Sequence, residues 1–116
     1  TKAITIVGPT NHRWGQVYAG DGLFFALEIE SENAHETGLQ IIESITYNYN
    51  NIDTVTLGRV KKLVADVDTP PSTSIVLAAK KQNALYVVGS GNGQVFLQRD
   101  GVWATVVSGD RAVSGL

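Results

Sequence analysis

Glu28 and Glu30 flank Ile29 at the end of the apolar run Leu23–Ile29, a spacing that could bind a cation. Residues two apart in a strand point to the same face, so the two carboxylates lie together. A hard cation needs several more oxygen ligands than this pair supplies, and the sequence offers few nearby. We therefore favour a solvated strand end before a helix N-terminus, where negative charge is stabilising, and keep Glu28 and Glu30 as candidate metal ligands.

His12 and His35 are the only histidines of the chain. A zinc site takes three or four ligands, usually in closely spaced pairs, and neither histidine has such a neighbour in the sequence. We interpret both as surface residues.

The glycine-rich stretch Gly89–Gly93 reads GSGNG and could bind an anion through exposed backbone N–H groups. It lacks the Lys-Ser/Thr pair of a phosphate-binding loop, and an apolar strand rather than a helix follows it. A hairpin or bulge turn is the better interpretation, with Asn92 kept as a candidate binding residue.

Thr1 introduces a different chemistry, because a terminal threonine can act as a nucleophile activated by its own amine. The start TKAITIVG superficially resembles that of proteasome-type N-terminal nucleophile hydrolases. Those enzymes also need a lysine in the early strands, and no lysine occurs between Lys2 and Arg59. A remnant of an expression tag is the alternative interpretation.

Four aromatic residues with a polar group are candidates for a binding face: Trp14, Tyr47, Tyr49 and Trp103. Core packing is the more common role of such residues, and we expect it above all for Trp103, which lies within an apolar run. Tyr47 and Tyr49 lie in a polar segment at the end of a predicted helix, so we expect them to be partly exposed.

Composition limits the classes of function. The chain has 116 residues, 43% of them hydrophobic and 17% charged, which is typical of one globular domain. A net charge of −2 gives no basic surface for nucleic acid, and no apolar run approaches the roughly 20 residues of a membrane span. Cysteine is absent, which excludes disulfides and thiolate metal sites and leaves the compartment open, with the cytoplasm favoured. Methionine is also absent, so we expect a processed product or an excised fragment.

Apolar periodicity and turn residues predict nine elements in the order β-β-β-α-α-β-β-β-β. This order indicates the α+β class: a mostly antiparallel sheet or sandwich in one domain, with two helices packed on one face. The expected strands are Ala3–Val7, Trp14–Tyr18 and Leu23–Ile29 before the helices, then Ile75–Ala79, Leu85–Val88, Val95–Leu97 and Val102–Val107 as a meander.

The two predicted helices have clear apolar stripes. The first should start at an N-cap Ser31 and end at Asn48–Asn51, and it carries Gly38 within its apolar stripe, which indicates close approach to a sheet. The second should be capped by Thr54 and end before Pro70-Pro71. Leu23–Ile29 is a nearly continuous apolar run, so we expect that strand to be covered on both faces.

Several segments, taken in order, resemble the N-terminal half of the metal-dependent type-2C serine/threonine protein phosphatases. Gly22–Glu28 resembles the strand that delivers a metal-binding Asp in that family, and Ala34–Ile45 resembles the helix after it. Ser72–Ala78 is similar to the family's small-Thr-Thr/Ala strand. Leu85–Gly101 resembles its strand, Gly-Asp-Ser-Arg turn, strand and Arg-Asp-Gly hairpin. The resemblance covers nearly the whole chain and implies half of an αββα fold, truncated relative to the family.

The departures from the family fall on its chemistry. Glu28 stands where the metal-bridging Asp is expected and Ile29 where a Gly offers its carbonyl. Asn92 replaces the Asp of the Gly-Asp-Ser-Arg turn, Gln94 replaces its Arg, and Arg13–Tyr18 contains no acidic residue. A two-metal site needs several converging oxygen ligands, which these replacements do not provide.

We therefore expect a non-catalytic, pseudophosphatase-like domain with no cofactor. Half of such a domain should leave apolar sheet surface or strand edges uncovered, which predicts a homodimer or docking onto another protein segment. One alternative is a residual phosphatase that binds manganese or magnesium with Glu28 as a ligand. The second alternative is the hydrolase with Thr1 as its nucleophile.

Overall fold

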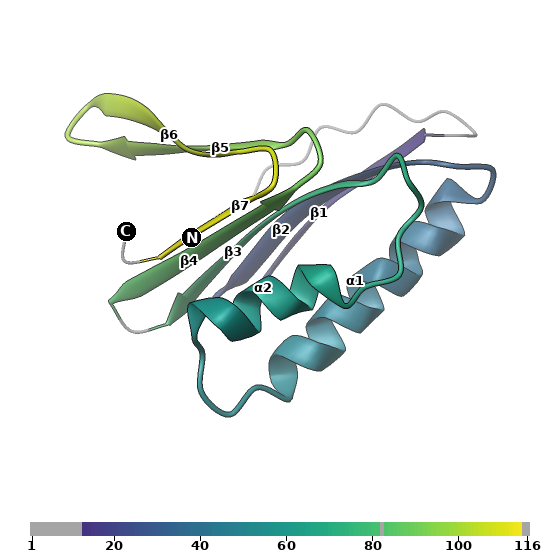
Figure 1. The fold of residues 1–116 in the computed structure, drawn as a ribbon, viewed down its shortest axis with the longest axis horizontal. Coiled ribbons are helices and arrows are strands. Elements are labelled where there is room, and N and C mark those ends of the chain that lie inside the picture. Colours follow the sequence, from purple (N-terminus) through teal and green to yellow (C-terminus); the bar gives the residue numbers. More distant parts are fainter. Residues whose placement is uncertain (1–12, 82, 115–116) are drawn as a thin grey trace.

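A five-stranded antiparallel sheet forms the centre of the protein (Figure 1). A computed structural model describes residues 13–81 and 83–114. The strands follow the order β1-β2-β3-β4-β7, and their bounds are β1 Arg13–Gly20, β2 Leu23–Glu30, β3 Ser74–Lys81, β4 Ala84–Ser90 and β7 Arg111–Ser114. This α+β architecture, with mostly antiparallel strands and two helices, confirms the predicted fold class and element order.

The hairpin between β1 and β2 turns at Asp21 and Gly22, which have φ angles of 43° and 79°. Two successive positive φ values are typical of a type I′ turn, whose twist matches that of the flanking strands. The two strands are therefore joined by a tight turn. It fixes a register in which Glu28 lies opposite Gly15 on β1 and opposite Ser74 on β3.

Two helices, α1 (Ala34–Asn50) and α2 (Leu57–Ala65), pack on one face of the sheet (Figure 1). Their predicted ends are right and their predicted starts are wrong. The N-cap of α1 is Asn33, not Ser31, and no side chain bonds its first turn. The N-cap of α2 is Thr56, not Thr54, and its hydroxyl accepts a hydrogen bond from the Arg59 N–H at 3.2 Å.

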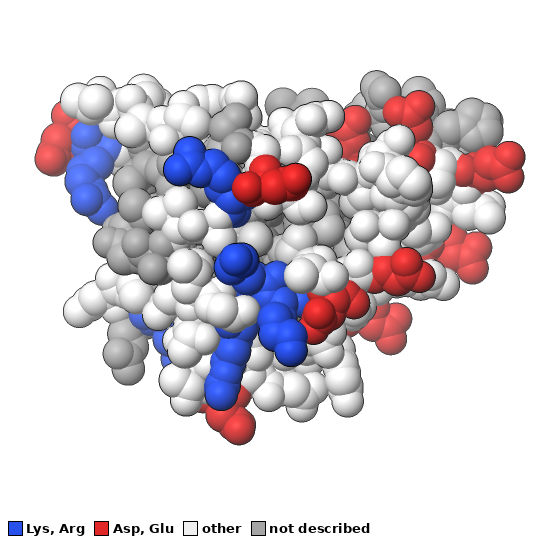
Figure 2. Space-filling view, viewed as in Figure 1, with Lys and Arg blue, Asp and Glu red and all other residues white. Residues whose placement is uncertain are grey.

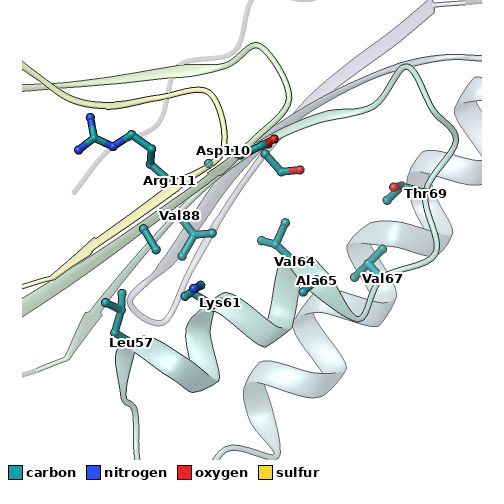
Figure 3. A pocket seen from close by; sticks show the side chains of 12 residues that line it. Leu57, Lys61, Val64, Ala65, Val67, Thr69, Val88, Asp110 and Arg111 are labelled. Carbon is teal, nitrogen blue, oxygen red and sulfur yellow. The ribbon is translucent and has the colours of Figure 1, made fainter.

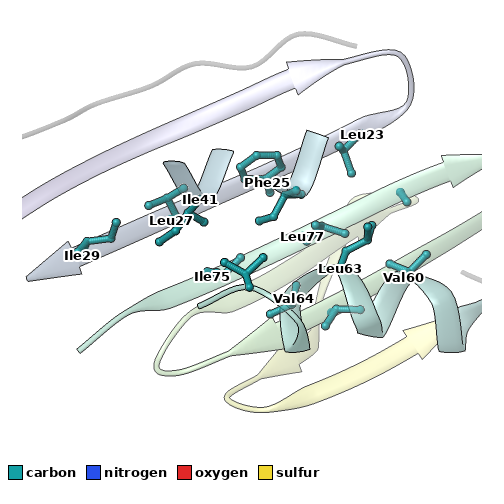
Figure 4. Packing of buried hydrophobic residues seen from close by; sticks show 14 of the residues in the cluster. Leu23, Phe25, Leu27, Ile29, Ile41, Val60, Leu63, Val64, Ile75 and Leu77 are labelled. Atoms are coloured by element: carbon teal, nitrogen blue, oxygen red, sulfur yellow. The ribbon is translucent and has the colours of Figure 1, made fainter. Parts of the chain in front are cut away.

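The core lies between this sheet face and the two helices (Figure 4). On β2 and β3 every second residue is buried beneath the helices, as the period of a strand requires. The helices contribute residues that recur at helical spacing on one face: Ala34, Gly38, Ile41 and Ile45 of α1 and Val60, Leu63 and Val64 of α2. Fully buried members of the core include Leu23, Ile29, Ile41, Ile45, Val60, Ile75 and Leu77.

At Gly38, helix α1 approaches the sheet too closely for a side chain to fit. A Cβ atom at this position would lie 1.9 Å from Cζ3 of Trp14 on β1, so only glycine fits beneath the indole ring. The expected close approach is confirmed. The lower helix propensity of glycine, about 1 kcal/mol relative to alanine, is offset by the contact it permits.

The hairpin of β5 (Gln94–Arg99) and β6 (Val102–Ser108) forms a separate two-stranded sheet on the face opposite the helices (Figure 1). The predicted meander is therefore correct for the pairs β3-β4 and β5-β6 but wrong between β4 and β5. Gly91, with a φ of 86°, lets the chain leave the main sheet there. The place beside β4 is taken by β7 instead.

Strand β7 was not expected, because four residues with two polar ends give almost no periodic signal. The strand predicted at Ala3–Val7 lies outside the described residues. None of the described helices has the length and apolar character needed to cross a membrane.

Candidate functional site

The predicted carboxylates lie on the helix-free face of the sheet, which is the face opposite α1 and α2. Glu28 and Glu30 are both exposed there, at the carboxyl end of β2. Their placement on one face is confirmed. Within residues 13–81 and 83–114, no three His, Asp or Glu side chains gather closely enough to hold a metal ion.

Asn92 lies close to this end of β2, through Ser74. Ser74 is directly opposite Glu28 on the neighbouring strand, and its Oγ accepts a hydrogen bond from the Asn92 N–H at 3.1 Å. The N–H of the preceding residue, Gly91, donates a hydrogen bond to Asp110 Oδ1 at 2.7 Å. The polar contacts of the Gly89–Gly93 turn therefore fix the point at which the chain leaves the main sheet.

The four candidate aromatic residues do not form one site. Trp14 is half-buried beneath α1, and its ring meets His35 edge-on with centroids 5.4 Å apart. Tyr47 is 68% exposed on α1, whereas Tyr49 packs against the core. Burial and, secondarily, the charge of Asp21 raise the pKa of the Tyr49 phenol above its ordinary value. Trp103 is on the hairpin and 65% exposed, so the expected burial of this residue is wrong.

His35 is exposed at the start of α1, as expected for a surface histidine. His12 and Thr1 lie outside the described residues. The hydrolase hypothesis that depends on Thr1 therefore stays a prediction.

The helix-free face has an apolar centre formed by alternate residues of β1, β2 and β3. These side chains are half-buried: Val17, Phe24, Ala26, Val76 and Ala78. The hairpin β5-β6 lies over the β4 side of this face, where Val87 is fully buried, and leaves the β1-β2-β3 side uncovered within the described residues. Among the described residues, the prediction that β2 is covered on both faces is therefore met on the helix side.

A groove of about 310 Å³ runs between this apolar centre and strand β5. Phe24, Val76 and Ala78 line it from the sheet, and Val95 and Phe96 line it from the hairpin. Phe96 is 52% exposed. Gln98 lies on the same face of the hairpin as Phe96, two residues after it, and Trp103 is directly opposite Gln98. Trp103 therefore shares the face of Phe96. Sheet and hairpin together thus present one continuous apolar surface, which we call the open groove.

Of this surface, the sequence singled out Trp103 as a candidate binding residue but none of the residues on the main sheet. The signal was present in Leu23–Ile29, where apolar residues occupy both faces of the strand. A strand with both faces apolar needs two covering layers. The described residues supply one complete layer, the helices, and one partial layer, the hairpin.

Comparison with known proteins gives no relatives: no family model, curated protein or solved structure matches the chain.

Proposed function

We propose that this protein is a non-catalytic, type-2C-phosphatase-like domain that acts through protein contacts, and that the open groove is its contact surface. The preferred partner is a second copy of the chain, which gives a homodimer. The observation that carries the proposal is the apolar centre of the helix-free face, half-exposed between β5 and β1, the first strand of the main sheet among the described residues.

A contiguous apolar surface is the property that distinguishes a contact site from the scattered apolar residues of an ordinary surface. Phe24 and Phe96 approach the open groove from two different sheets, so a partner seated there would contact both. Packing of a second sheet on such a face places the two sheets about 10 Å apart, with their apolar side chains interdigitated, as in β-sandwiches. Among the described residues, the main sheet and the two-stranded hairpin thus resemble a β-sandwich whose second sheet covers only part of the first.

The resemblance to the type-2C phosphatases supports the non-catalytic part of the proposal. Three positions that the resemblance assigns to family motifs, Glu28, Ser74 and Asn92, come together at one end of the helix-free face. The chemistry of the side chains differs from that of the family, because an amide replaces an acid at Asn92. A phosphatase of this class needs carboxylates to hold the ions that activate its water.

Sedimentation velocity over a range of protein concentrations tests the proposal. The protein should form a dimer whose dissociation constant rises at least about tenfold in Phe24→Glu, because a buried charge in an apolar interface is strongly unfavourable. Phe96→Glu should have the same effect from the hairpin side, which keeps the test valid if the β2 variant folds poorly. Leu39→Glu is the matched control, since Leu39 is 50% exposed on α1, away from the open groove.

A protein that stays monomeric at the highest concentrations, or a dimer that Leu39→Glu weakens as much as Phe24→Glu does, would contradict the proposed surface. Calorimetry with manganese and magnesium and turnover of a chromogenic phosphate ester test the non-catalytic part. Metal binding accompanied by turnover that Glu28→Gln abolishes would replace the proposal by the residual-phosphatase alternative.

A further inference from the structure

A second surface, distinct from the open groove, lies at the opposite edge of the main sheet, where β7 is the last strand. Strand β7 pairs with β4 on one side, and within the described residues no strand pairs with its other side. The outward N–H and C=O groups of an edge strand are ready to bond another extended chain. Proteins commonly bind extended peptides by adding them to such an edge.

The edge of β7 borders a groove of about 620 Å³ between the strand and helix α2 (Figure 3). Leu57 and Val64 of α2 and Val88 of β4 point into this space, and Ala112 of β7 completes its apolar lining. We call it the α2-β7 groove. A strand added to β7 would therefore have its backbone on the β7 edge and one row of its side chains in the α2-β7 groove.

The pleat of β7 decides which of the added side chains enter the groove. Ala112 is opposite Val88, so it faces α2, whereas Arg111 is opposite the neighbouring Gly89 and faces the other way. Figure 3 shows the Arg111 side chain directed away from α2. Side chains directly opposite each other share a face in any sheet. An added strand must therefore carry apolar residues in register with Ala112 and a different kind of residue in register with Arg111.

The charges beside β7 indicate which kind of residue that is. Arg111 is an exposed cation on the face of β7 that is directed away from α2, and Lys61 is an exposed cation of α2 at the border of the α2-β7 groove. Asp110 is the only acidic residue lining the groove within the described part of the chain, and it accepts the hydrogen bond from Gly91. In Figure 2 blue side chains gather over the centre of this face, where α2 lies, with most red ones to the right. Acidic side chains complement this surface.

We propose that the β7 edge binds an extended segment of a partner protein in which apolar and acidic residues alternate. The segment adds to β7 as a sixth strand of the main sheet, its apolar side chains enter the α2-β7 groove, and its carboxylates pair with Arg111. Lys61 on the rim of the groove adds to the attraction. The site is independent of the open groove, because it lies on the helix side of the opposite sheet edge.

Fluorescence anisotropy with a labelled short peptide, in which valine alternates with glutamate, tests this site on the full chain. The peptide should bind saturably, and a peptide in which lysine replaces glutamate should bind at least about tenfold more weakly. Arg111→Glu should reverse this preference. Arg99→Glu makes the same charge change at the end of β5, outside the lining of the α2-β7 groove, and is the matched control that should leave both affinities unchanged.

Backbone N-methylation of the peptide separates strand addition from simple charge attraction. In an added strand, the N–H groups of every second residue face β7 and the others face away. A peptide methylated at the residues whose N–H groups face β7 should not bind, whereas a peptide methylated at the intervening residues should bind normally. Equal binding of the two methylated peptides would overturn the strand-addition mode. No saturable binding, or an unchanged preference in Arg111→Glu, would overturn the site.

Discussion

The two faces of the main sheet are made of similar residues but meet different surroundings. On the helix side, alternate residues of β2 and β3 are almost fully buried beneath α1 and α2 (Figure 4). On the other side, the intervening residues of the same strands are only half-buried around the open groove. An apolar pattern on both faces of a strand thus indicates that two covering layers are needed, and residues 13–81 and 83–114 provide one of them in full.

The largest expected difference between the faces comes from Ile75 and Val76, neighbours on β3. Ile75 is 2% exposed beneath the helices, so Ile75→Ala should lower the free energy of unfolding by about 2–5 kcal/mol through the cavity it leaves. Val76→Ala should lower it by about 1 kcal/mol or less, because Val76 on the helix-free face is already in partial contact with solvent. Urea unfolding of the two variants measures both values.

The unfolding should be followed at a concentration where the protein is monomeric, so that association does not contribute. Under those conditions, losses of equal size in Ile75→Ala and Val76→Ala would contradict the comparison. Such a result would mean that the helix-free face is already covered in the monomer.

Gly38 and Gly93 allow the two faces of the sheet to be compared by adding a methyl group to each, through substitution by alanine. A Cβ at Gly38 would lie 1.9 Å from the Trp14 ring, and a Cβ at Gly93 would lie 2.5 Å from Cγ1 of Val76 on the helix-free face. Gly38→Ala should destabilise the protein by about 1–3 kcal/mol despite the gain in helix propensity, because α1 cannot withdraw from the packed indole. Gly93→Ala should cost less, since half-buried Val76 can shift outward.

Thermal unfolding of the two variants gives the order of the effects. Combining Gly38→Ala with Trp14→Leu should recover part of the loss, because the smaller side chain removes the clash, and this non-additivity identifies the contact. A double variant whose loss equals the sum of the single losses would show that Trp14 is not the obstacle.

The sequence predicts the helix side of this molecule well and the other side poorly. Helical spacing of Ala34, Gly38, Ile41 and Ile45 identifies the buried face of α1, because a repeat of 3.6 residues is long enough here to be distinct. The helix starts are less well predicted. Ser31 has a capping side chain, yet its Oγ is buried without a hydrogen-bond partner in the structure, and the helix begins later.

The placement of the hairpin could not be predicted from local signals. Gly89–Gly93 has the composition of a hairpin turn, so β4 and β5 were expected to pair. The outcome depends on long-range contacts instead: Ser74 and Asp110 bond the turn, and β7 occupies the place beside β4. Both candidate surfaces, the open groove and the α2-β7 groove, are consequences of that rearrangement. This explains why the sequence predicted uncovered sheet surface or strand edges without locating either surface.

The smallest expected effect concerns the border of the helix side, where Tyr49 of α1 lies beneath the β1-β2 turn. Its hydroxyl oxygen would be 3.9 Å from a Cβ at Gly22, and burial, followed by the charge of Asp21, raises its pKa. Because the folded protein holds this proton more tightly than the unfolded chain does, stability is unaffected well below the ordinary pKa of 10.0 and falls as the pH rises through it.

Asp21→Asn should therefore lower the pKa of Tyr49, since it removes the smaller of the two causes, and should leave the pKa above its ordinary value because burial persists. The phenolate absorbance of each protein minus that of its Tyr49→Phe derivative follows this single group through the alkaline range. Asp100→Asn is the matched control, because Asp100 occupies the same positive-φ position in the β5-β6 turn, at 54° compared with 43° for Asp21. Equal shifts of the Tyr49 pKa in Asp21→Asn and Asp100→Asn would mean that Asp21 acts through the net charge of the protein rather than through its position near Tyr49. The β1-β2 turn would then have no specific electrostatic contact with α1.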